Sequence, residues 1–225
     1  MSRGLPIVVA LAATTLAAAP GPLRVKASPA VAPCVVAAGL EYERATGRRL
    51  AVETAAIGSP ASADGADVVV AADSELNRVI ESGASHPDLD VDVARIPWVL
   101  VGAPGAPAPE IGSLARSTTR VRILGGAVSR EALRNLSLQG AAPEHGERFD
   151  GTRGPLRLGP GEAAIVPLSL AGPGPVSRLS VPPIVARALG VRASARKDAA
   201  RAFLDFLASG PGNQAFRACG RTEAR

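Results

Sequence analysis

Apolar side chains recur at helical spacing near the C-terminal end of the chain. Four of them fall on one face of a helix: Ala200, Phe203, Leu204 and Leu207. Gly210 is predicted to end this helix. Pro211 suits the first turn of another helix, because the N–H groups there have no intrahelical acceptor and proline lacks an N–H. Because a strand-like run at residues 185–189 comes shortly before, the pattern predicts a strand followed by two short packed helices.

Strand and helix patterns alternate through the first half of the chain. Strands are predicted at residues 23–28, 48–56 and 66–73, and helices at residues 33–46 and 74–83. The last of these strands is a continuous apolar run, which is typical of a strand covered on both faces in a parallel sheet. The order of elements therefore indicates a βαβ arrangement.

The second half adds further strands and one long irregular segment. Strands are predicted within residues 94–107, 120–126, 162–172 and 179–190, and a helix at residues 129–138. Residues 139–162 are rich in glycine, proline and charge, so this segment is predicted to be a loop. The whole pattern predicts an α/β protein.

Residues 1–19 have the composition of a secretory signal peptide. Arg3 gives a positive start, an apolar centre follows, and alanines at 17–19 supply a cleavage region. A permanent membrane anchor is disfavoured, because the apolar stretch is interrupted by Pro6 and falls short of the roughly 20 residues that span a bilayer. We therefore expect an exported protein, periplasmic or otherwise extracytoplasmic.

Composition and charge place the chain among globular proteins and argue against nucleic-acid binding. Of its 225 residues, 47% are hydrophobic and 20% are charged. The formal net charge of +5 comes with arginines scattered along the chain, without the dense basic run that nucleic acid attracts. Aromatic residues make up only 3%, so stacking platforms for bases are scarce. A weak positive field would still favour the approach of a small anion.

Two cysteines, Cys34 and Cys219, lie on predicted helices near opposite ends of the chain. In an oxidising compartment they could form a disulfide that closes nearly the whole chain. Two buried free thiols on apolar helix faces are an equally open alternative.

No motif for catalysis or metal binding is evident in the sequence. His86 and His145 fall in predicted loops, without metal-ligand spacing to the cysteines. Asp88, Asp90 and Asp92 alternate, but they lack the glycine and glutamate spacing of a calcium loop, so we interpret them as an exposed polar edge. We therefore predict that the chain is not an enzyme and that it holds no metal and no cofactor.

The segment KDAARAFLDFLASGPGNQAFRACG, residues 197–220, resembles the C-terminal end of bacterial periplasmic solute-binding proteins. The likeness is greatest to those that bind molybdate and related oxyanions, and the earlier segments LRVKAS, YERATG and ADVVVAAD resemble them as well. This resemblance implies a two-lobed α/β fold of the type 2 periplasmic-binding-protein class. Mixed sheets would be flanked by helices, with a hinge between the lobes.

The resemblance also implies how the chain divides between the lobes. Residues 23–95 would form the first part of lobe one, residues 96–180 lobe two, and residues 181–220 the return to lobe one with the C-terminal helices. Two crossing segments, residues 94–99 and 181–186, would act as hinges.

In such a protein the anion lies between the lobes, at loops that follow strand ends and at helix N-termini. The ligand-binding residues that the resemblance implies are Ser28, Ala30, Gly58, Ser59, Ala127, Val128, Ser129 and Ser169. Backbone N–H groups and hydroxyls there can hold an oxyanion without a full counter-charge. Taken singly, a loop serine is ordinarily only a turn or capping residue.

The site departs from the family pattern at several positions. The family's first-loop serine falls on Ala30, with Ser28 two residues earlier, and the helix after Ser59 is shortened. A tyrosine that commonly approaches the oxyanion is replaced by Pro167, which offers neither a hydroxyl nor an N–H. Scaffold motifs are therefore retained better than site motifs.

The resemblance implies a monomeric solute-binding protein that captures a small anion and delivers it to the permease of an ABC importer. A molybdate-like oxyanion is the ligand class it implies first. Contact with the membrane would be through the permease alone, and neither nucleic acid nor a cofactor would take part. The principal alternative is a divergent relative whose site has decayed and which acts as a sensor or partner-binding protein. An enzyme on the same scaffold is a third possibility.

Overall fold

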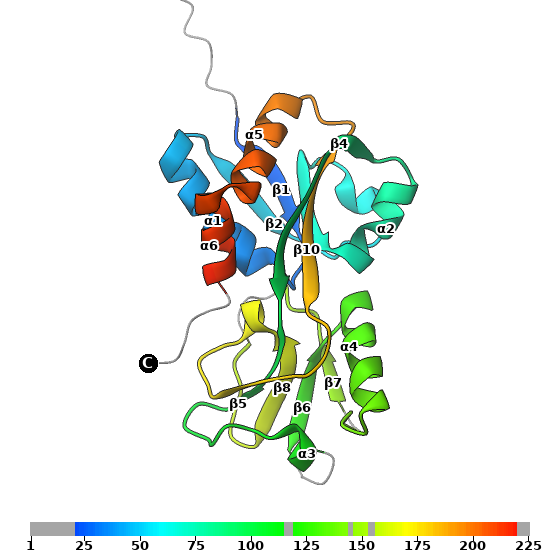
Figure 1. The fold of residues 1–225 in the computed structure, drawn as a ribbon, viewed down its shortest axis with the longest axis vertical. Coiled ribbons are helices and arrows are strands. Elements are labelled where there is room, and N and C mark those ends of the chain that lie inside the picture. Colours follow the sequence, from blue (N-terminus) through cyan, green and yellow to red (C-terminus); the bar gives the residue numbers. More distant parts are fainter. Residues whose placement is uncertain (1–20, 115–118, 144–145, 153–155, 220–225) are drawn as a thin grey trace, which may run out of the picture.

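Two α/β lobes, stacked along the long axis of the molecule in Figure 1, each contain a five-stranded mixed sheet. This computed structural model describes residues 21–114, 119–143, 146–152 and 156–219. The predicted signal peptide at residues 1–19 and His145 lie outside the described residues.

The sheet of lobe one has the strand order β2-β1-β3-β10-β4. Its strands are β1 (Leu23–Ala27), β2 (Leu50–Thr54), β3 (Val68–Ala72), β4 (Ser85–Ile96) and β10 (Ile184–Val191). Strand β1 runs parallel to β2 and β3, whereas β10 is antiparallel to β3 and β4. All five residues of β3 are buried, as the continuous apolar run predicted.

Four α-helices and one 3₁₀ turn accompany this sheet. They are α1 (Ala32–Thr46), α2 (Asp73–Glu81), α5 (Lys197–Ala208), α6 (Gly210–Ala218) and the turn η1 (Pro60–Ala63). Helix α1 ends at Gly47, whose φ of 69° is the left-handed conformation that glycine adopts without strain. No helix in the described part of the chain is long and apolar enough to cross a membrane.

The C-terminal helices pack as their sequence pattern predicted. The buried residues of α5 are Ala200, Phe203, Leu204 and Leu207, which confirms the expected stripe. The ring of Phe203 meets that of Tyr42 from α1 edge to face, with ring centroids 5.2 Å apart. Helix α6 begins directly after Ser209 and carries Pro211 in its first turn. Helices α1, α5 and α6 therefore form one packed layer in lobe one (Figure 1).

The sheet of lobe two has the order β7-β6-β8-β5-β9. Its strands are β5 (Trp98–Gly102), β6 (Arg120–Leu124), β7 (Gly146–Phe149), β8 (Glu162–Pro167) and β9 (Val176–Arg178). The remaining elements are α3 (Ile111–Leu114), α4 (Ala127–Leu138) and the turn η2 (Leu168–Leu170). Strand β8 pairs antiparallel with β5 and parallel with β6, so this sheet is mixed as well.

The chain crosses between the lobes twice. Strand β4 ends at Ile96 and β5 begins at Trp98, with Pro97 between them. On the return, β10 begins at Ile184 and pairs there with Ile96. The two predicted crossing segments therefore lie side by side (Figure 1). Their action as hinges stays a prediction, as do the detailed lobe boundaries.

Two predictions about local structure are wrong. Residues 139–162 were predicted as a loop, but they contain β7, whose residues are exposed or half-buried and so lack an apolar signature. His86 was also predicted in a loop, yet it lies in the 12-residue strand β4. Strand β4 forms an edge of its sheet, where charged side chains are tolerated and guard against unwanted pairing. The alternating aspartates lie on this polar edge.

Candidate functional site

The parallel strands of lobe one end at the edge of the sheet that faces lobe two, and Ser28 lies there. It follows β1 directly, and its N–H donates to the Val70 carbonyl at 2.9 Å. Its own carbonyl accepts from the N–H groups of Val31 and Ala32, which starts α1. The Ser28 side chain is fully buried, and its Oγ makes no hydrogen bond of good geometry with any described residue. The carboxyl of Glu75 on α2 lies close enough for this hydroxyl to lower its pKa, so a ligand oxygen would compete with that carboxyl for the Ser28 hydroxyl.

The second predicted loop is more open. Gly58 is half-buried, and Ser59 is exposed at the N-terminus of the turn η1. The Ser59 carbonyl accepts hydrogen bonds from the N–H and the hydroxyl of Ser62, so the loop is closed on itself. The turn η1 is four residues long, in agreement with the shortened helix predicted after Ser59. The structure therefore brings Ser28 and Ser59 to one lobe but not into one buried pocket.

The N-terminus of α4 is the corresponding element of lobe two. Gly126 precedes it with a φ of 103°, a conformation that side-chain-bearing residues rarely adopt. Ala127 is half-buried, whereas Val128 and Ser129 are buried, and Ser129 Oγ bonds back to the Gly125 carbonyl at 3.5 Å. The first N–H groups of a helix have no intrahelical acceptor, and the helix dipole favours an anion at that end. This terminus can therefore bind an oxyanion.

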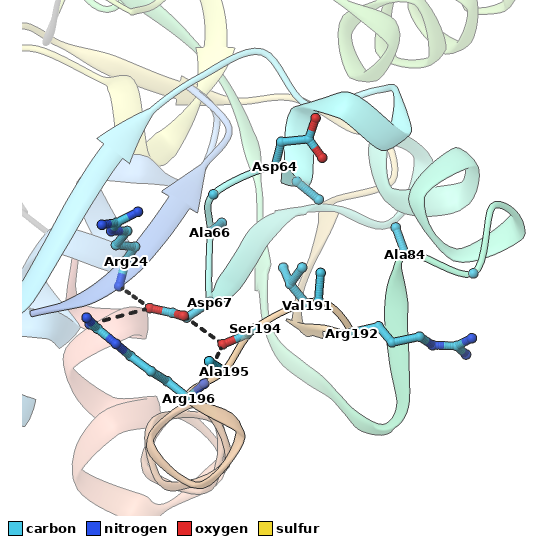
Figure 2. A pocket seen from close by; sticks show the side chains of 14 residues that line it. Arg24, Asp64, Ala66, Asp67, Ala84, Val191, Arg192, Ser194, Ala195 and Arg196 are labelled. Carbon is cyan, nitrogen blue, oxygen red and sulfur yellow. Dashed lines mark hydrogen bonds and ion pairs between the residues drawn. The ribbon is translucent and has the colours of Figure 1, made fainter.

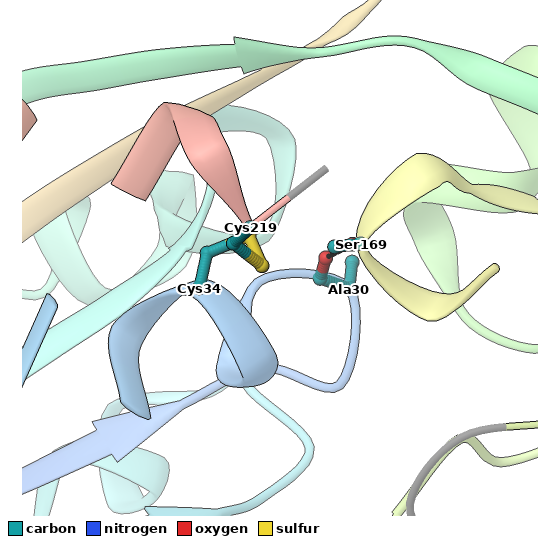
Figure 3. Close-up of a disulfide and its surroundings, with 4 residues drawn as sticks. All are labelled: Ala30, Cys34, Ser169 and Cys219. Carbon is teal, nitrogen blue, oxygen red and sulfur yellow. Dashed lines mark hydrogen bonds between the residues drawn. A yellow bond between two sulfur atoms is a disulfide. The ribbon is translucent and has the colours of Figure 1, made fainter. Parts of the chain in front are cut away.

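Ser169 and Ala30 face each other across the junction of the lobes. Ser169 lies on η2 in lobe two, and its Oγ donates to the Ala30 carbonyl of lobe one at 2.5 Å (Figure 3). Both residues are buried. The hydroxyl proton of Ser169 is thus used by the protein itself, and the bond holds the lobes together at this point.

A disulfide joins the first turn of α1 to the end of α6, next to this contact. Cys34 and Cys219 are bonded, with Cα atoms 5.0 Å apart (Figure 3). The bond closes a loop with a sequence separation of 185 residues. It therefore anchors the C-terminal helix beside the loop that carries Ala30.

Glu75 is a site residue that the sequence analysis did not identify. It is the third residue of α2, and its Oε2 accepts from the Ala72 N–H at 3.1 Å. Its Oε1 lies 4.0 Å from the point where a β-carbon on Gly126 would be. Burial raises the pKa of this carboxyl, while the nearby Ser28 hydroxyl and the Ala72 N–H partly oppose the shift. A glutamate in the first turn of a helix is ordinary in a sequence, so only its position between the lobes marks it.

Two cavities flank the junction of the lobes. One of about 230 Å³ is lined by Trp98, Val128 and residues of α2, and it opens beside the returning chain at Pro183. The other, of about 510 Å³, lies on the side of Cys34 and Arg178. Neither is lined by Ser28 or by Glu75. The lobes therefore pack closely around Ser28, while space remains at the periphery.

A further cavity of about 640 Å³ lies at the opposite edge of lobe one, where β1 and β3 begin (Figure 2). The Asp67 carboxylate there accepts from the Arg24 N–H at 2.8 Å and from Ser194 Oγ at 2.6 Å. Arg196 Nη1 lies 3.9 Å from it. Asp67 is buried and fully engaged, so this cluster links β1, β3 and the segment after β10. We interpret it as structural.

The charged groups beside strand β10 pair with one another. Arg187 of β10 donates to Asp90 of β4 and to Asp73 of α2, and these carboxylates raise the pKa of the guanidinium further. Within the described ranges, no three His, Cys, Asp or Glu side chains gather as metal ligands would.

No protein-family model and no curated protein matches the sequence of this chain. Solved structures do match its fold. The periplasmic molybdate-binding protein of Azotobacter vinelandii aligns with a TM-score of 0.73 at 16% identity, over 90% of this chain and 100% of that one. The sulfate-binding protein SubI of Mycobacterium tuberculosis aligns with a TM-score of 0.60 at 19% identity, over 88% and 85% of the two chains.

A substrate-binding domain assigned to a molybdenum ABC transporter of Clostridium difficile also aligns. Its TM-score is 0.59 at 17% identity, over 88% of this chain and 96% of that one. Together with the two sheets and the paired crossing strands, these likenesses confirm the predicted fold class. The chain has the two-lobed α/β fold of type 2 periplasmic-binding proteins.

Proposed function

We propose that this chain is an extracytoplasmic solute-binding protein that captures a small oxyanion between its lobes and delivers it to an ABC importer. The anion would lie near Ser28, where the closely packed lobes would have to part to admit it, with the N-terminus of α4 reaching it from lobe two. Ala30 and Ser169 would close the site at one side, and Gly58 and Ser59 would border it at the other. Delivery would be to a membrane permease, and the protein would act as a monomer without a cofactor and without catalysis.

The observation that carries this proposal is the fully buried hydroxyl of Ser28, which lies beside the Glu75 carboxyl and makes no hydrogen bond of good geometry with a described residue. Proteins seldom bury a hydroxyl without a partner, because its lost hydration is not replaced. A ligand oxygen would supply that partner. The N–H groups at the start of α4 would contribute further donors, so the site favours an acceptor-rich anion. The molybdate- and sulfate-binding neighbours support the same ligand class.

A thermal-shift titration of the purified protein against phosphate, arsenate, sulfate, molybdate and tungstate tests the proposal. A ligand that binds only the native state adds RT ln(1 + [L]/Kd) to its stability, about 2.7 kcal/mol at a hundredfold excess over Kd. We expect at least one of these anions to raise the melting temperature selectively.

Ser28→Ala separates binding from folding. Removing a buried hydroxyl that makes no hydrogen bond of good geometry should change the ligand-free stability only slightly, while the loss of a hydrogen bond to a charged ligand should weaken anion binding about ten- to a hundredfold. Ser180→Ala, at an exposed position, is the matched control and should bind as the wild type does. A folded wild type that responds to no anion would overturn the proposal.

A second candidate function is a sensor or partner-binding protein in which the small-ligand site has decayed. Pro167 and the bond between Ser169 and Ala30 favour it, because both remove a polar group from ligand contact. In that case the two lobes would stay closed without a ligand, and the titration would give no shift.

A further inference from the structure

Ser28 and the start of α4 offer hydrogen-bond donors, but Glu75 brings a different chemistry to the same place. A carboxylate is an acceptor only, and it becomes a donor only when it is protonated. The Glu75 side chain is 9% exposed, and its two oxygens lie beside the Ala72 N–H of lobe one and Gly126 of lobe two. An anion held by Ser28 and by the N-terminus of α4 would therefore also touch Glu75.

Two anions in contact need a proton between them. Sulfate, molybdate and tungstate carry no proton near neutral pH, so beside an ionised Glu75 there would be only hydrogen-bond acceptors on both sides. Hydrogen phosphate and hydrogen arsenate retain a hydroxyl, which can donate to the carboxylate while their other oxygens accept from Ser28 and α4. A partly buried hydrogen bond of this kind is strong, because its acceptor is charged and water is excluded.

We propose that Glu75 makes the interlobe site selective for a tetrahedral oxyanion that carries its own proton, of the hydrogen phosphate or hydrogen arsenate type. Fully deprotonated oxyanions are excluded unless Glu75 itself takes up a proton. This inference rests on the proposed function, and it narrows the ligand class that the sequence resemblance implied.

The other charged groups around α2 do not reach the Glu75 carboxyl. On its own helix, Asp73 pairs with Arg187 of β10, and Arg78 and Glu81 are exposed. Helix α4 carries Arg130, Glu131 and Arg134, which are exposed, whereas β3 contributes only valine and alanine. Asp64, at the end of η1, is exposed as well. Burial raises the pKa of Glu75, and only the Ser28 hydroxyl and the Ala72 N–H oppose this upward shift. No charged side chain therefore competes with a ligand for this carboxyl.

Isothermal titration of the purified protein, at a pH where the Glu75 carboxyl is ionised, measures the selectivity directly. The wild type should bind phosphate and arsenate at least about a hundredfold more tightly than sulfate and molybdate. Glu75→Gln keeps the size of the side chain and an oxygen for the Ala72 N–H. It should weaken phosphate binding and strengthen sulfate and molybdate binding, each at least about tenfold. Glu81→Gln removes the same charge from the same helix at an exposed position and should change neither.

A pH series on the wild type provides a measurement that needs no variant. Binding of sulfate or molybdate requires uptake of one proton by Glu75, so their affinity should fall up to about tenfold per pH unit above the pKa of the free carboxyl. Hydrogen phosphate supplies the proton itself, so its binding should not show this fall over the same range. Glu75→Gln should remove the pH dependence for sulfate and molybdate.

The alternative outcomes separate the two proposals. If the wild type binds molybdate as tightly as phosphate and Glu75→Gln changes neither, the selectivity inference is overturned and the proposed function stands. If Glu75→Gln binds every anion more tightly, phosphate included, the carboxylate merely repels anions from the site, and the inference is again overturned. If folded wild type and Glu75→Gln bind no anion at all, the proposed function fails and the inference fails with it.

Discussion

The Ser169 hydroxyl of lobe two donates a hydrogen bond to the Ala30 carbonyl of lobe one. Both residues were predicted to touch the ligand, and the structure instead pairs them with each other. The bond lies next to the disulfide that fixes the first turn of α1, so lobe one presents a firmly held acceptor to lobe two (Figure 3). We therefore expect this contact to stabilise a closed arrangement of the two lobes in the ligand-free protein.

Ser169→Ala should therefore loosen the lobes in the absence of ligand. Loss of one neutral hydrogen bond is worth about 1 kcal/mol, which lowers the ratio of closed to open molecules about fivefold. Small-angle X-ray scattering should show a larger radius of gyration for the ligand-free variant than for the wild type. Ser137→Ala, at an exposed position on α4, should leave the radius unchanged. Equal radii for Ser169→Ala and the wild type would mean that the bond does not hold the lobes.

The disulfide should be a major source of stability. In the chain-entropy model, a bond between Cys34 and Cys219 with a separation of 185 residues is worth about 5 kcal/mol. The double substitution Cys34→Ala, Cys219→Ala should lower the free energy of unfolding by about that amount in urea. Because the chain has only 2 cysteines, reductant should destabilise the wild type and leave the double variant unchanged. A mass equal to that of the fully reduced chain in the purified protein would contradict the bond.

Much of the fold was predictable because its strongest signals are periodic. The stripe of α5 and the run of β3 are buried as the spacing indicated, since a helix or a central strand must bury its apolar positions. Strands β7 and β9 were missed for the opposite reason. They are short and lie at the two edges of the second sheet, where exposed side chains give no alternation to detect.

The site was less predictable, because its properties depend on contacts between the lobes. Nothing within the sequence near Ser169 shows that its hydroxyl is used by Ala30, 139 residues away. Glu75 was missed because a glutamate three residues into a helix is a common capping feature. A usable signal existed in the topology: Ser28 and Glu75 follow parallel-sheet strands β1 and β3 at the same edge, so their side chains had to lie close together.

Asp67 should matter for stability and not for ligand binding. Asp67→Ala removes the acceptor for the Arg24 N–H and for Ser194 Oγ, and it should lower the free energy of unfolding by about 2 to 3 kcal/mol. Asp64→Ala, at a nearby exposed position, should change it by less than about 0.5 kcal/mol. Anion affinity should stay the same in both variants, because the cavity in Figure 2 lies at the far edge of lobe one. A selective loss of anion binding in Asp67→Ala would move the ligand site to that cavity.

Glu75 should make the stability of the protein fall as pH rises. The pKa of its carboxyl is raised from 4.5 in the folded state by burial, so the unfolded chain releases this proton at a lower pH than the native protein does. Below the pKa of the unfolded chain, Glu75 is protonated in both the folded and the unfolded state, and its contribution to stability is fully present. It is lost between the unfolded and the folded pKa.

Glu75→Gln cannot ionise, so the ligand-free variant should be more stable than the wild type near neutral pH. The difference between the two should vanish below about pH 4.5, where the wild-type carboxyl is also neutral. Urea unfolding of the two proteins across this range, with Glu81→Gln as the exposed control, measures the effect. A difference between wild type and Glu75→Gln that does not change with pH would contradict the burial of this carboxyl, and with it the argument that an oxyanion must bring its own proton.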